Sequence, residues 1–196
     1  MTTTVAGLFD RYEDADRVIR ALYNYGIATN EINVVTRAET LPGRPSDPVT
    51  ESPERASALS TAAVGGAATG GLIGLLAGVT ALVVPGIGPV ITVGSVAAAM
   101  GLTAASAGIG AAAGGLIGAL SDLGLPEKES NVYAEGIKRG GILVTIQAED
   151  EERNEVEDLL HEMGAVDVNT RRAEWQQSGW QRFEEVPAAE ANVRRS

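Results

Sequence analysis

The chain has 196 residues, with 26 acidic against 15 basic side chains, a formal net charge of −11, no cysteine and one histidine. This acidic balance argues against a nucleic-acid-binding protein, because no basic face is available to neutralise phosphates. Without cysteine there is no disulfide, thiolate metal site or thiol nucleophile, and His161 alone gives poor support to a zinc site or a Ser-His-Asp triad. We therefore expect no catalytic residue, no cofactor and no metal.

Charge divides the chain into three blocks. Residues 1–55 carry −3 and residues 122–196 carry −8, whereas residues 56–121 contain no charged and no aromatic side chain. Half of this 66-residue block is glycine or alanine, at 15 and 18 residues. The apolar block is internal, and the first residues lack a basic-then-apolar pattern, so no signal peptide is expected. An uncharged block inserted between two polar flanks is the organisation that this pattern predicts.

The first flank, residues 1–37, reads as one strand–helix–strand unit. An apolar run over residues 4–9 predicts a buried strand, and Asp10 is placed as the N-cap of a helix over 12–25. The apolar positions with helical spacing end at Tyr25, and Gly26 is a suitable C-cap. A second strand is expected over 31–37.

Residues 38–55 contain Pro42, Pro45, Pro48 and Pro53 and are expected to be a linker.

The second flank, residues 122–173, repeats this plan after a short helix expected over 127–139. A strand is predicted over 141–148, with Asp150 as cap of a helix over 151–163 that Gly164 ends, and a last strand over 166–171. Placing Gly26 on Gly164 aligns the two units, and these pairs then coincide: Val18 with Val156, Leu22 with Leu160, and Leu8 with Ile146. Two such halves predict an α+β domain of the ferredoxin-like split βαβ type, a four-stranded antiparallel sheet with two helices on one face. Two independent βα units are the alternative.

Residues 174–196 are expected to be a tail. Trp175 and Trp180 in this tail would pack on the sheet domain or rest at a bilayer surface.

The uncharged block predicts a helical hairpin with arms over 57–84 and 90–120. Its turn is expected at Pro85, Gly86, Gly88 and Pro89, because these residues break a helix. Glycines recur every four or seven residues, which places them in stripes that let helices approach closely in the small-xxx-small mode. The candidate packing and self-association residues of this glycine zipper are Gly66, Gly70, Gly74, Gly78, Gly94, Gly101, Gly108, Gly110, Gly114 and Gly118.

Glycine in a helix interior costs about 1 kcal/mol relative to alanine, so these arms must be surrounded by lipid or by protein. Arm length and the absence of charge favour a hairpin in the cytoplasmic membrane with both termini in the cytosol. The membrane hairpin is the expected arrangement, and the alternative is a soluble homo-oligomer with the hairpins as its shared core, which the missing aromatic belt and the diluted second arm support. The expected partners are therefore the chain itself and a lipid bilayer. A small-ligand sensor or enzyme that uses the sheet face is a third reading, by fold analogy alone.

Other candidate motifs are better explained by structure. The pattern from Gly108 to Gly114 resembles a dinucleotide-binding loop, but no strand precedes it. Asp10, Asp14 and Asp16 lack the spacing of a calcium loop. Glu127 and Glu129 are typical of an exposed helix start.

The motifs taken in order carry a family resemblance. They are VAGLFDRYEDADRVIRAL and INVVT, then VPGIGPV within the glycine-rich block, then LGLPEKES, GGILVTIQAED and GAVDVNTR. This combination resembles the bacterial general-stress or low-temperature-induced protein family and extends to Trp180. The resemblance implies a small α+β domain interrupted by a glycine-rich hydrophobic segment. It also implies a stress-associated, non-catalytic role, and it supplies no catalytic or ligand-binding residues.

Overall fold

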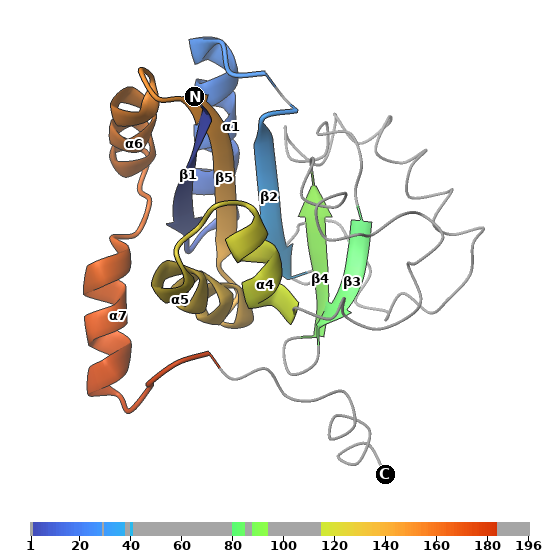
Figure 1. Cartoon of the computed structure of the whole chain (residues 1–196), viewed down its shortest axis with the longest axis vertical. Helices are drawn as coiled ribbons and strands as arrows, with labels where there is room; N and C mark the ends of the chain where they lie inside the picture. Colours follow the sequence, from blue (N-terminus) through green and yellow to red (C-terminus); the bar gives the residue numbers. More distant parts are fainter. Residues whose placement is uncertain are drawn as a thin grey trace, which may run out of the picture.

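The computed structural model describes residues 2–28, 30–37, 40, 80–84, 88–93 and 115–183. These residues form an α+β structure in which one antiparallel sheet carries helices on both faces (Figure 1). The strand order is β1-β5-β2-β4-β3. The strands are β1 (Thr2–Phe9), β2 (Ile32–Arg37), β3 (Thr80–Val84), β4 (Gly88–Val93) and β5 (Ile142–Glu149). The predicted α+β class is confirmed, as are the strands expected near residues 4–9, 31–37 and 141–148.

The helices of the described residues are α1 (Tyr12–Tyr25), α4 (Gly115–Asp122), α5 (Glu127–Lys138), α6 (Arg153–Glu162) and α7 (Val168–Gln177). Helices α1, α5 and α6 confirm the helices that the sequence predicts over residues 12–25, 127–139 and 151–163. Gly26 ends α1 with a positive φ of 114°, and Gly164 follows α6 with a φ of 97°, a backbone region that glycine enters without a steric penalty. Tyr25 is 50% exposed, so the apolar face of α1 ends one turn earlier than predicted, at Leu22.

Neither predicted aspartate caps its helix. Arg11 is the N-cap of α1 and Glu152 that of α6, and neither makes a side-chain capping bond. Asp10 instead accepts two hydrogen bonds from the Arg171 guanidinium, at 3.2 and 2.7 Å. The Asp10 carboxylate therefore binds Arg171, which is distant in the sequence, and does not cap the helix.

The sheet is buried on both faces by two separate apolar clusters. The first cluster lies under α1 and α6 and contains Phe9, and the second lies under α4 and α5 and contains Leu8. These two neighbours are 0% and 1% exposed and point to opposite faces, as strand geometry requires. Burial on both sides explains why the strands read as continuous apolar runs rather than as alternating ones.

The internal repeat holds for the helices but not for the strands. Val18, Val156, Leu22 and Leu160 all lie in the first cluster, as their alignment predicts. Leu8 and Ile146, however, belong to opposite faces of the sheet. The strand–helix connection differs in length between the halves, so the strand register is shifted relative to the helices.

The strand predicted over 166–171 is reduced to one bridge. The Val166 N–H donates to the Leu8 carbonyl at 2.8 Å, and the chain then turns into α7. Asp167 causes this turn because its side chain accepts a hydrogen bond from the Thr170 N–H and caps the helix. Helix α7 crosses the expected boundary at residue 173, so residues 174–177 belong to the fold. Trp175 is 8% exposed, which favours packing on the domain over a position at a bilayer.

The middle of the uncharged block forms a β-hairpin, not helical arms. β3 and β4 pair from Thr80↔Thr92 to Val84↔Gly88, and β4 pairs with β2 from Val34↔Val93 to Arg37↔Val90. The chain does reverse near the predicted turn, but Gly88 and Pro89 lie within β4. The helical prediction is therefore wrong over residues 80–84 and 90–93. Because β4 pairs with β2, the described strands of this hairpin extend the α+β sheet.

Candidate functional site

Most of the residues predicted to mediate helix packing lie outside the described residues. These are Gly66, Gly70, Gly74, Gly78, Gly94, Gly101, Gly108, Gly110 and Gly114, together with Pro85 and Gly86 of the turn. Gly118 lies in α4, and Gly88 and Pro89 lie in β4. Of the predicted glycine stripe, Gly118 is the position that falls within the described part of the chain.

Helix α4 packs one side on the domain. Leu116, Ala119 and Leu120 are 2%, 8% and 0% exposed and join the second apolar cluster. Val90 of β4, at 0% exposed, lies in the same cluster. Within its described residues, the uncharged block therefore contacts the domain near its centre and at its C-terminal end.

Gly118 lies on another side of this helix. It is half-buried, and a Cβ placed there would have no neighbouring atom within 4 Å. In contrast, a Cβ at Gly136 of α5 would lie 2.6 Å from the Leu8 side chain. Close approach of the backbone explains Gly136, whereas nothing in the described fold requires Gly118 to be small.

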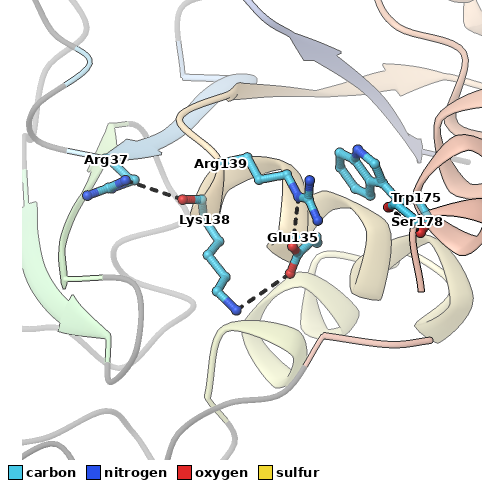
Figure 2. A network of polar contacts seen from close by, with 6 residues as sticks. All are labelled: Arg37, Glu135, Lys138, Arg139, Trp175 and Ser178. Atoms are coloured by element: carbon cyan, nitrogen blue, oxygen red, sulfur yellow. Dashed lines mark hydrogen bonds and ion pairs between the residues drawn. The ribbon is translucent and has the colours of Figure 1, made fainter. Parts of the chain in front are cut away.

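A polar network joins the C-terminal end of α5 to α7 and β2 (Figure 2). The Glu135 carboxylate, on a residue that is 5% exposed, accepts from Arg139 Nε at 2.8 Å and lies 3.8 Å from Lys138 Nζ. Arg37 Nη1 donates to the Lys138 carbonyl at 3.3 Å. Cations at a helix C-terminus are favoured by the helix dipole. The buried carboxylate is thus held by two cations of its own helix, an arrangement that stabilises the junction.

Trp175 of α7 covers this network. The Arg139 guanidinium carbon lies 4.7 Å from the centroid of its ring, and that of Arg171 lies 5.9 Å away. Trp180 meets the Trp175 ring edge-on at 5.7 Å. Two guanidinium groups near one indole add cation–π attraction to its burial. Sequence analysis missed this cluster, although the i, i+3 and i, i+4 spacing of Glu135 with Lys138 and Arg139 is a readable signal.

Tyr133 of α5 is a buried phenol, 3% exposed, where this helix packs on the sheet. Its hydroxyl donates to the Ala6 carbonyl at 3.4 Å, at the outer edge of β1. Burial raises the pKa of the Tyr133 phenol well above its usual value, and the carboxylates of Glu129 and Glu157 raise this pKa further. A phenol that stays protonated and donates to a backbone carbonyl orients α5 on the sheet.

Replacing Tyr133 by Phe is expected to make the free energy of unfolding fall less steeply as the pH rises above about 10. The folded pKa is raised, so the stability that depends on the protonated phenol is fully present below about pH 10 and is lost as the pH rises towards the folded value. In the wild-type chain this loss approaches about 1.4 kcal/mol per pH unit above pH 10. Urea unfolding at pH 9 and pH 11 measures the difference. Tyr23→Phe, at a position 59% exposed, is the matched control, and an equal effect of both variants would contradict the assignment.

The described residues offer little for chemistry beyond packing. In residues 2–28, 30–37, 40, 80–84, 88–93 and 115–183, no group of three or more His, Asp or Glu side chains could hold a metal ion. His161 is exposed on α6. At the start of α5 Glu127 is exposed, as the sequence indicated, whereas Glu129 is half-buried. Across the same ranges, no helix is both long and apolar enough to cross a bilayer.

Fold and site together describe an α+β domain into which an uncharged segment is built. No family model, curated protein or solved structure matches the chain.

Proposed function

We propose that this chain is a non-catalytic stress-response protein that self-assembles through its uncharged block, residues 56–121. The stress-related role rests on the ordered motifs that resemble the general-stress family. The assembly role rests on α4, where Gly118 has open space around it while Leu116 and Leu120 of the same helix face the domain.

We infer that the scaffold is a ferredoxin-like split βαβ domain with a minimal fourth strand. Its halves are β1-α1-β2 and β5-α6 followed by Val166. Two observations support this inference: β5 lies between β1 and β2, and Val166 bridges the other edge of β1. The block is inserted between the halves, and its β3–β4 hairpin extends the sheet beyond β2.

The direction of the glycine row supports self-association. Residues four apart lie on one face of a helix, so a helical continuation of α4 would align Gly110 and Gly114 with Gly118. That face is separate from the face that packs on the second apolar cluster. Smooth rows of this kind let two helices approach closely. We propose that a second copy of the chain packs on this face of α4. Each copy has a net charge of −11, but the block carries no charge, so contact between two blocks does not bring their own charged side chains together.

Substituting Gly118 by Leu and by Ala tests this proposal. The two residues have similar helix propensities but differ in size, so Ala is the matched control for Leu. We expect Gly118→Leu to reduce the molar mass measured by light scattering, and Gly118→Ala to keep it. An unchanged mass in both variants would contradict the glycine contact.

Carbonate extraction of the expressed protein separates the two environments for the block. Release as a defined oligomer supports assembly with a second copy. Retention in the membrane pellet would overturn this proposal in favour of the lipid bilayer.

A further inference from the structure

The outer edge of β1 has backbone groups that point away from the sheet. The Gln147 N–H of β5 donates to the Glu31 carbonyl on the β2 side, so the alternate β5 residues Val144 and Ile146 face β1. Their partners in the register, Val5 and Gly7, therefore make the inner hydrogen bonds of β1. It follows that Thr2, Thr4, Ala6 and Leu8 direct their N–H and C=O groups outward. The Val166 N–H, which donates to the Leu8 carbonyl, confirms this direction.

Most of this edge lacks a neighbour among the described residues. The single bridge to Val166 occupies Leu8, and the Tyr133 hydroxyl reaches the Ala6 carbonyl, which has a second lone pair. The outward groups of Thr2 and Thr4 meet no partner in the part of the chain that the structure describes. Proteins usually protect such an edge with a charge, a proline or a bulge. Residues 2–9 contain no charge and no proline, and their register with β5 is continuous.

We propose that the outer edge of β1 pairs with β1 of a second copy, antiparallel and centred on Thr4. The Val166 bridge closes the edge at Leu8, so the open run extends from Thr2 to Ala6, and Thr4 is its midpoint. Two such runs can pair about a twofold axis without meeting either bridge. Thr4 then faces Thr4 of the partner subunit, and Thr2 faces the partner subunit's Ala6. Since each outward residue supplies a donor and an acceptor, both sheets would join into one.

This pairing is isologous, so this contact on its own closes at two copies. It uses the edge of the sheet opposite to β3 and makes no use of Gly118, so it stands independently of the glycine row. The strand itself is uncharged, whereas each copy carries a net charge of −11. Added salt screens this long-range repulsion, so we expect the dimer to strengthen as ionic strength rises.

Thr4→Pro in the full chain is the direct test, with Thr4→Val as its matched control. Both substitutions remove the Thr4 hydroxyl, which donates to the Leu123 carbonyl. Only proline also removes the outward N–H, and proline is tolerated on the edge of a sheet where that N–H faces away from the ladder. We expect Thr4→Pro to halve the molar mass in sedimentation equilibrium and Thr4→Val to keep it. Equal masses for the two variants would overturn the proposal.

Amide hydrogen exchange of the wild-type chain gives a second measurement, which does not depend on the folding of a variant. Pairing protects the outward amides of Thr2, Thr4 and Ala6 in a concentration-dependent manner. We expect this protection also in Gly118→Leu, which separates the edge from the glycine contact. Exchange of the Thr2 and Thr4 amides at the rate of an open strand end at every concentration would overturn the proposal, whatever oligomer forms elsewhere.

Discussion

Gly136→Ala is expected to lower the free energy of unfolding by about 1–3 kcal/mol, whereas Gly118→Ala is expected to raise it by up to about 1 kcal/mol. Both residues lie in helices, so both substitutions gain the same helix propensity. They differ in space: a Cβ at Gly136 would lie 2.6 and 2.9 Å from the two methyl groups of Leu8, and one at Gly118 has no neighbour within 4 Å. Urea denaturation of the two variants measures the contrast.

Leu8 supplies the control for this contrast. It is 1% exposed and lies between β1 and α5, so the cost of Gly136→Ala should fall when Leu8 is also shortened to Ala. The double-mutant cycle should therefore show a favourable coupling between the two sites. A stabilising effect of Gly136→Ala alone would show that α5 does not approach β1 as closely as the structure describes.

Local patterns of the sequence predicted most of the α+β domain. Helices α1 and α6 carry apolar residues at helical spacing, and their ends follow from Gly26 and Gly164. The wrong predictions concern residues whose structure is determined by a contact with a residue distant in the sequence. Asp10 has the chemistry of an N-cap, but Arg171 is close enough in space to take its carboxylate. No pattern within residues 1–37 contains that information.

The last predicted strand shows how a cap can override alternation. Residues 166–169 alternate apolar and polar side chains as a strand does, yet Asp167 and Thr170 are also spaced as a helix cap. The cap prevails, and α7 then brings Trp175 over Glu135 and Arg139. From the sequence, only the ion pairs of Glu135 along α5 could be predicted. The contact with Trp175 depends on α7, which begins where a strand was predicted.

The helical prediction is wrong over residues 80–84 and 90–93 for a different reason. A short apolar run cannot be assigned to a strand or a buried helix by periodicity alone. The β-branched residues of β3 and β4, bounded by Pro85 and the neighbouring glycines, favour strands, whereas the glycine rows on either side favour helices. Pairing with β2 settles the matter for residues 80–84 and 88–93, because Ile32–Arg37 would otherwise be an open edge. The glycine stripe itself remains a prediction.

Val90→Lys is expected to lower the free energy of unfolding by at least about 3 kcal/mol, because it places an unpaired cation in an apolar cluster. Val90 is 0% exposed, and its partner across the ladder is Arg37, so the new charge would also face a like charge. Val90→Ile adds one methylene and is the matched control, with an expected cost below about 1.5 kcal/mol. The transition should be followed by the fluorescence of Trp175 and Trp180, which lie outside the block.

This choice of reporter makes the experiment decisive for the place of the block in the fold. If β4 is part of the sheet, a charge at residue 90 must shift the unfolding of α7, because Val90 shares its cluster with Leu8 and Phe183. If the block were a separate helical hairpin, the tryptophan transition would keep its midpoint in Val90→Lys. An unchanged midpoint would therefore contradict the β4–β2 pairing and return the turn at Pro85 to the far end of a hairpin.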